Sequence, residues 1–172
     1  KDVKKYGQKA EALKKAINDN FWVEEDGYYA SYLYGRQNLT RTQQSETLGE
    51  SFCVLFGIAD EERAAKVISS MPVGEFGPPI FSPQIVSQPD YHNNGVWPYV
   101  TSFWGKAAAK VGNETALMHA LACNVRTASI YATNYENYSF NTGNPYTTQI
   151  NSPNMLWGLS GFMGLFHRTF FG

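Results

Sequence analysis

The feature that most constrains the fold is a helical spacing of apolar residues that recurs along the whole chain. Side chains three or four residues apart lie on one face of an α-helix, and this spacing predicts an amphipathic helix from Val3 to Phe21. Five more segments carry helical signals, over residues 46–56, 61–71, 99–111, 114–128 and 153–170. The strand–helix alternation of a parallel sheet is not found in the sequence. We therefore expect an all-α protein of packed helical hairpins, forming one domain over residues 1–172.

Several predicted helix ends have recognisable capping residues. Asp60 and Asn113 stand where an N-cap is needed, and Pro98 fits the first position of the fourth helix. Gly57 and Gly112 end the second and fourth helices.

The sixth helix is predicted to begin near Pro153, with Asn151 or Ser152 as its cap. It contains three glycines at a spacing of three, each of which lowers helix propensity by up to ~1 kcal/mol relative to Ala. They are Gly158, Gly161 and Gly164. Such a smooth face allows a neighbouring helix to approach closely.

The connection between the third and fourth helices is rich in proline. Its six prolines are Pro72, Pro78, Pro79, Pro83, Pro89 and Pro98. The apolar and aromatic residues between them are too many for a disordered segment. A long ordered loop in a small domain is usually functional.

Composition excludes several classes of protein. The net charge of −1 gives no attraction to polyanions, so nucleic acid is not an expected partner. No run approaches the ~18 apolar residues of a membrane span. Cys53 and Cys123 are predicted to be buried free thiols, and the three histidines share no ligand spacing, so we expect no metal site. No phosphate-binding loop is present, and no cofactor is expected.

The segment Pro89-Asp90-Tyr91-His92-Asn93-Asn94-Gly95-Val96-Trp97-Pro98-Tyr99 holds the densest set of ligand-binding side chains. Imidazole and amide donors of His92 and Asn93 stand beside the rings of Tyr91 and Trp97, a combination suited to hydroxyl-rich sugars with apolar faces. The alternative is an Asn-Asn-Gly turn whose tryptophan only fills the core.

Four blocks of the chain resemble, in the same order, the six-hairpin (α/α)6 glycosidases. The kin include glycogen-debranching amylo-α-1,6-glucosidases, α-glucosidases and mannosylglycerate-hydrolase-like enzymes. The blocks are Phe21-Trp22 with Gly27-Tyr28-Tyr29; Leu48-Gly49-Glu50-Ser51-Phe52-Cys53-Val54-Leu55-Phe56-Gly57-Ile58-Ala59; Tyr91-His92-Asn93 with Val96-Trp97-Pro98; and Tyr135-Glu136-Asn137-Tyr138 with Thr142-Gly143 and Leu156-Trp157-Gly158-Leu159-Ser160-Gly161.

The resemblance implies half of an (α/α)6 toroid, because the family has twelve helices and this chain has six. It implies an inverting, exo-acting hydrolase of α-linked oligosaccharides with Glu136 as the general base. Tyr91, His92, Asn93, Trp97 and Trp157 would line or support the sugar site. The family's general acid comes from an upstream hairpin, which has no counterpart here. The resemblance therefore implies a partner, either an N-terminal half of the same domain or a second copy.

Other interpretations stay open beside this one. From composition alone, Glu136 is a solvated loop carboxylate. If the chain is the whole mature protein, the missing general acid favours a non-catalytic carbohydrate-binding or interaction module of the same helical fold. Arg41 and Glu50 are candidates for the cleft, or else a surface ion and a carboxylate at a helix start. A periplasmic or extracellular location is favoured over a cytoplasmic one.

Overall fold

A computed structural model describes residues 2–172, and only Lys1 lies outside the described part. The six helices are α1 (Asp2–Phe21), α2 (Thr47–Leu55), α3 (Glu61–Ser70), α4 (Pro98–Lys110), α5 (Glu114–Tyr131) and α6 (Leu156–Leu165), which continues into a π-helix, η1 (Phe166–Phe170). The strands are β1 (Trp22–Val23), β2 (Tyr28–Tyr29), β3 (Leu33–Tyr34), β4 (Thr40–Arg41), β5 (Ser45–Glu46), β6 (Phe81–Ser82), β7 (Gly95–Val96) and β8 (Tyr138–Ser139). The predicted number and order of helices are confirmed.

The strands form four separate antiparallel pairs, β1–β2, β3–β4, β5–β6 and β7–β8. No sheet within residues 2–172 has more than two strands. Two-residue pairs cannot build a hydrophobic layer of their own, so they connect loops while the helices supply the core. The helical class predicted from the sequence is therefore confirmed.

Most predicted helix boundaries are also confirmed. Asp60 accepts a hydrogen bond from Arg63 N–H at 2.9 Å, and Asn113 accepts one from Ala116 N–H at 3.0 Å. Pro98 is the first residue of α4.

The sixth helix starts later than predicted, at Leu156 with Met155 as its N-cap. Asn151 does not cap it, because its amide group bonds to Pro145 O at 2.8 Å and Asn137 O at 2.7 Å. A good capping residue has been used to close the preceding loop instead.

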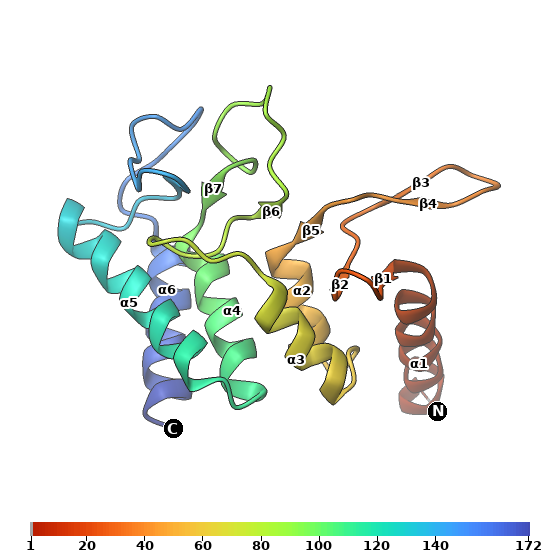
Figure 1. Ribbon diagram of the computed structural model, residues 1–172. Coiled ribbons are helices and arrows are strands. Elements are labelled where there is room, and N and C mark those ends of the chain that lie inside the picture. The colour runs from red at the N-terminus through yellow and green to blue at the C-terminus, as the bar shows by residue number, and fades with distance from the viewer. Residues whose placement is uncertain (1) are drawn as a thin grey trace.

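The helices are arranged in two layers, as Figure 1 shows. Helix α4 packs against α2 on one side and α6 on the other, so that alternate helices of the chain form a row. In the second layer α3 packs on α2, and α5 packs along α4. Helix α1 stands apart from both layers, and none of its side chains is buried.

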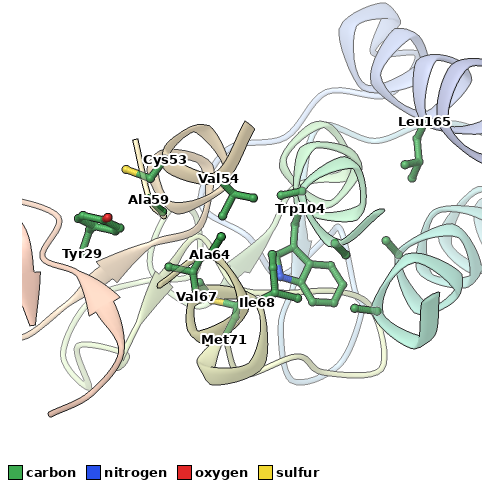
Figure 2. Close-up of a cluster of buried hydrophobic side chains, with 14 of the residues drawn as sticks. Tyr29, Cys53, Val54, Ala59, Ala64, Val67, Ile68, Met71, Trp104 and Leu165 are labelled. Carbon is green, nitrogen blue, oxygen red and sulfur yellow. The ribbon is translucent and has the colours of Figure 1, made fainter. Parts of the chain in front are cut away.

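The main hydrophobic core lies between the two layers. Figure 2 shows Trp104 of α4 at its centre, with Val54, Val67 and Ile68 on one side and Leu165 of α6 on the other. Helix α4 therefore contributes to the packing of both ends of the row.

The glycine face predicted for the sixth helix is the face that packs on α4. A Cβ atom at Gly161 would lie 3.3 Å from the Tyr99 ring and 3.4 Å from Ser102. Helix α4 has a similar close approach at Gly105, where a Cβ would lie 2.8 Å from Ala120 and 3.0 Å from Leu165. These glycines allow α4 to lie close to both α6 and α5.

Candidate functional site

The three long connections of the chain meet at one end of the molecule. They cover residues 22–46, 71–97 and 132–155, and each leads into a helix of the central row (Figure 1). The pair β5–β6 joins the first connection to the second, and β7–β8 joins the second to the third. Residues far apart in the sequence are in this way brought to the N-terminal ends of α2, α4 and α6.

Asn93 organises the second of these loops. Its side-chain oxygen accepts a hydrogen bond from Ile85 N–H at 2.7 Å, and its amide nitrogen donates to Ile85 O at 3.0 Å and Gln88 O at 3.1 Å. The side chain is buried, and these bonds occupy its donor and acceptor groups. Asn93 is thus placed to support the neighbouring residues.

Four of the predicted site residues form one aromatic cluster. Trp97 is buried and donates its indole N–H to Tyr91 O at 3.0 Å. The His92 ring stacks on it at 5.1 Å, and the rings of Tyr91 and Trp157 meet it edge-on at 5.2 Å and 5.5 Å. Trp157 also lies 4.8 Å from Tyr99 of α4. The aromatic cluster therefore spans the start of α4 and the start of α6, with Trp97 at its base.

Exposure within the cluster decides which members can touch a ligand. His92 is exposed, and Tyr91 and Trp157 are partly buried. The two partly buried rings can offer apolar surface to a sugar, while the imidazole can donate or accept a hydrogen bond. Trp97 holds these rings in position from below.

Glu136 lies in the third connection, close to Tyr91. Its backbone N–H donates to Ser152 O at 3.0 Å, which fixes the residue beside the start of the last helix. Burial raises the pKa of Tyr91, and the negative charge of Glu136 raises it further. Phe140 N–H also donates to Asn94 O at 2.8 Å, tying the two loops together. The partly buried Glu136 carboxylate and the aromatic cluster therefore share the same end of the molecule.

Glu46 is a site residue that the sequence reasoning did not select. Its two carboxylate oxygens accept hydrogen bonds from Leu48 N–H at 3.1 Å and Gly49 N–H at 2.6 Å, which cap α2. Burial raises the pKa of Glu46 above its ordinary value. The amide hydrogen bonds and the nearby His92 lower the pKa, but by less than burial raises it. The pattern Ser-Glu before an apolar run is a possible capping signal. Helical spacing alone predicts Glu46 inside the helix, whereas the structure has it as the N-cap of α2. Its carboxylate gives the cluster a second acidic neighbour, on the α2 side.

Glu50, one turn further along α2, is almost completely enclosed, at 1% exposure. One carboxyl oxygen accepts a hydrogen bond from Tyr29 N–H at 2.6 Å, and the other has no partner in the described structure. Burial raises its pKa to about 8, so the group is mainly protonated at neutral pH. Glu50 is therefore more than a carboxylate near a helix start. It also lines a cavity of about 230 Å³ between α1 and α2.

Arg41 lies elsewhere, in the β3–β4 hairpin. Its guanidinium group is exposed and donates to Asn20 O at 2.6 Å, so it anchors the hairpin to the end of α1.

Stacking rings, hydrogen-bonding side chains and carboxylates at one end of a helical domain define the kind of site that a glycoside hydrolase uses. Residues 1–158 match the family model of the mannosylglycerate hydrolase MGH1-like glycoside hydrolase domain. The chain belongs to this family, and a carbohydrate is its substrate class. A search of curated proteins finds no match. Within residues 2–172, no helix has both the length and the apolar character needed to cross a membrane.

Proposed function

We propose that the chain is the C-terminal half of the catalytic domain of an inverting, exo-acting glycoside hydrolase that cleaves α-linked oligosaccharides. Glu136 is the general base. The observation that carries the proposal is the position of Glu136 beside Tyr91, next to a cluster of rings that can hold a sugar.

Each member of the cluster has a distinct part in this proposal. Tyr91 and Trp157 stack on the apolar face of the sugar, which orients the ring and excludes water from one side. Trp97 and Asn93 support them from below, through the indole and amide hydrogen bonds described above. His92 and Glu46 bind sugar hydroxyl groups, since an imidazole and a fixed carboxylate accept or donate such bonds strongly.

Glu136 activates the attacking water in the proposed reaction. Its carboxylate takes a proton from water as the oxygen attacks the anomeric carbon, and the glycosidic bond breaks on the opposite face. The leaving oxygen needs a proton from a carboxylic acid roughly 6.5–9.5 Å from the base. We assign that acid to a polypeptide segment outside these residues, in an N-terminal half of the same domain.

The substrates to test follow from the enzymes that the sequence resembles and from the family to which the chain belongs. Isomaltose and maltose represent the debranching and α-glucosidase reactions, and α-mannosylglycerate represents the family description. An exo-acting enzyme should release one monosaccharide or glycerate per event and no internal fragments.

The stereochemistry of the product tests the proposal. In the complete enzyme, proton NMR during early turnover of an α-linked substrate should show the β-anomer first, before mutarotation. Release of the α-anomer would refute the inverting mechanism and the role of Glu136 as a base. Sugar binding without turnover in the complete enzyme would instead support the non-catalytic carbohydrate-binding module.

A further inference from the structure

One short part of the third connection contacts both halves of the candidate site. This bridge segment covers residues 145–152. Gln149 N–H donates to Asp90 O at 2.8 Å, in the loop that carries the aromatic cluster. Ser152 O accepts the backbone N–H of Glu136 at 3.0 Å. The bridge segment is therefore hydrogen-bonded to the loop of sugar-stacking rings and to the residue that carries the carboxylate.

Asn151 holds the bridge segment in its closed shape. Its amide nitrogen donates to Asn137 O at 2.7 Å and to Pro145 O at 2.8 Å. Its side-chain oxygen accepts the backbone N–H of Ser152 at 2.9 Å and that of Asn137 at 3.3 Å. A primary amide has two donor hydrogens and an oxygen with two lone pairs, and these four bonds already match them. A single side chain thus joins three separate points of the loop.

Asn137, the residue after Glu136, is the counterpart of Asn151. It is completely buried, and its side chain donates to Ile150 O at 3.0 Å. Its backbone N–H and C=O are both bonded to the Asn151 amide group. The backbone at Glu136 and Asn137 is therefore bonded along its length to residues 150–152. The place of Glu136 depends on Asn151 although no contact between their side chains is needed.

The aromatic cluster is held by a different set of hydrogen bonds. Asn93 fixes the loop through Ile85 and Gln88, and Trp97 bonds to Tyr91 O. None of these bonds involves the bridge segment. Loss of the Asn151 amide should consequently move the carboxylate relative to the rings and leave the rings themselves in place.

We propose that Asn151 is a positioning residue for the general base, because its amide group sets where Glu136 lies relative to a sugar held by Tyr91 and Trp157. A misplacement of about 1 Å can lower a catalytic rate roughly 10²-fold. Aspartate at this position lacks both donor hydrogens and would face two carbonyl oxygens, and glutamine is longer by one methylene group. The inference rests on the proposed function and adds the residue that keeps the base in register with the sugar.

The kinetic test uses Asn151→Ala in the complete enzyme. The value of kcat should fall by about 10–100-fold while KM changes by less than about twofold, since sugar binding does not depend on the bridge segment. Asn151→Asp keeps the size and both acceptor bonds, so it carries the same test if Asn151→Ala does not fold. A raised KM with unchanged kcat would overturn the proposal, because Asn151 would then act on sugar binding.

Asn141→Ala is the matched control. Asn141 belongs to the same connection, is exposed, and has no side-chain hydrogen bond within residues 2–172. This variant should keep full activity. A loss as large as that of Asn151→Ala would overturn the proposal, because any disturbance of the loop would then have the same effect.

A double-mutant cycle with Glu136→Gln shows whether Asn151 acts through the base. In the Glu136→Gln background, Asn151→Ala should lower kcat by less than about twofold, because no base remains to be positioned. An equal fall in both backgrounds would overturn the proposal. Full activity of Glu136→Gln alone would instead refute the proposed function, so the two failures are distinguishable.

Hydrogen exchange in the 172-residue chain tests the bridge segment without turnover. The backbone N–H groups of Glu136, Asn137 and Ser152 are all bonded to residues 151–152. In Asn151→Ala these amides should exchange at least about tenfold faster, since exchange follows local opening. The N–H of Phe140, which is bonded outside the bridge segment, should keep its rate. Unchanged exchange at Glu136 and Asn137 would overturn the proposal, whatever the kinetics.

Discussion

The buried Glu50 carboxyl group makes a prediction about stability as a function of pH. In the folded chain its pKa is about 8, because burial disfavours the charged form, whereas an unfolded Glu titrates near 4.5. Between these two values the unfolded chain binds fewer protons than the folded chain. Stability contributed by this group is therefore complete below about pH 4.5 and is lost as pH rises toward 8.

The magnitude follows from the difference in pKa. Each pH unit in this window removes about 1.4 kcal/mol, so about 3 kcal/mol is lost at pH 7 relative to pH 4.5. Glu50→Gln cannot ionise and should escape that loss. Its free energy of unfolding should therefore exceed that of the unmodified chain by about 3 kcal/mol more at pH 7 than at pH 4.5, in order of magnitude.

Urea denaturation followed by fluorescence from pH 4.5 to 8.5 measures this difference. Glu24→Gln is the control, because Glu24 is an exposed carboxylate with a lowered pKa and should not produce a gain toward alkaline pH. Dilute protein keeps any association out of the measurement. A Glu50→Gln variant whose difference from the unmodified chain does not change with pH would refute the assignment of a raised pKa to this group.

Three further outcomes are expected. Gly105→Ala should destabilise the chain by about 1–3 kcal/mol in urea denaturation, because the new Cβ would overpack Ala120. Gly7→Ala in α1, which has open space around it, should be neutral or stabilising by up to ~1 kcal/mol. A larger loss of stability at Gly7 than at Gly105 would contradict the packing of α4 on α5. Asn93→Ala removes three hydrogen bonds and should weaken carbohydrate binding by at least about tenfold in calorimetry, through loss of loop order, whereas unchanged binding would show that the loop does not depend on them. Trp157→Ala should lower affinity for the same sugar by about 1–3 kcal/mol while the fold is retained by circular dichroism, and an unchanged affinity would remove this ring from the site.

Local signals predicted the helices well, because caps and apolar spacing act within a few residues. Asp60, Asn113 and Pro98 lie at the N-terminal ends of α3, α5 and α4, as the sequence predicts. The glycines of α6 face α4. Local signals predict the start of α6 too early, because Asn151 is suited both to cap a helix and to close a loop. Only the tertiary contacts show that it closes the loop.

The site was harder to predict because its members meet through contacts between distant loops. The pairing of β7 with β8 brings Glu136 toward Tyr91, and two-residue pairs leave no periodic trace in a sequence. Glu46 and Glu50 are four residues apart and share a helix face, but spacing does not show that one caps a helix and the other is enclosed. Burial of a charged residue type is a tertiary property, and here it changes the protonation state.

The role of Glu136 is tested most directly by replacing it with glutamine in the complete enzyme. Glu136→Gln keeps the shape of the side chain but cannot take a proton from water, so kcat should fall by roughly 10²–10⁴-fold. Carbohydrate affinity, measured by calorimetry, should be nearly unchanged because the rings remain in place. The exposed Glu25→Gln is the matched control and should retain full activity. In the isolated 172-residue chain the Glu136 substitution should change no measurable turnover. A complete enzyme that keeps full activity with Glu136→Gln would show that another residue is the base.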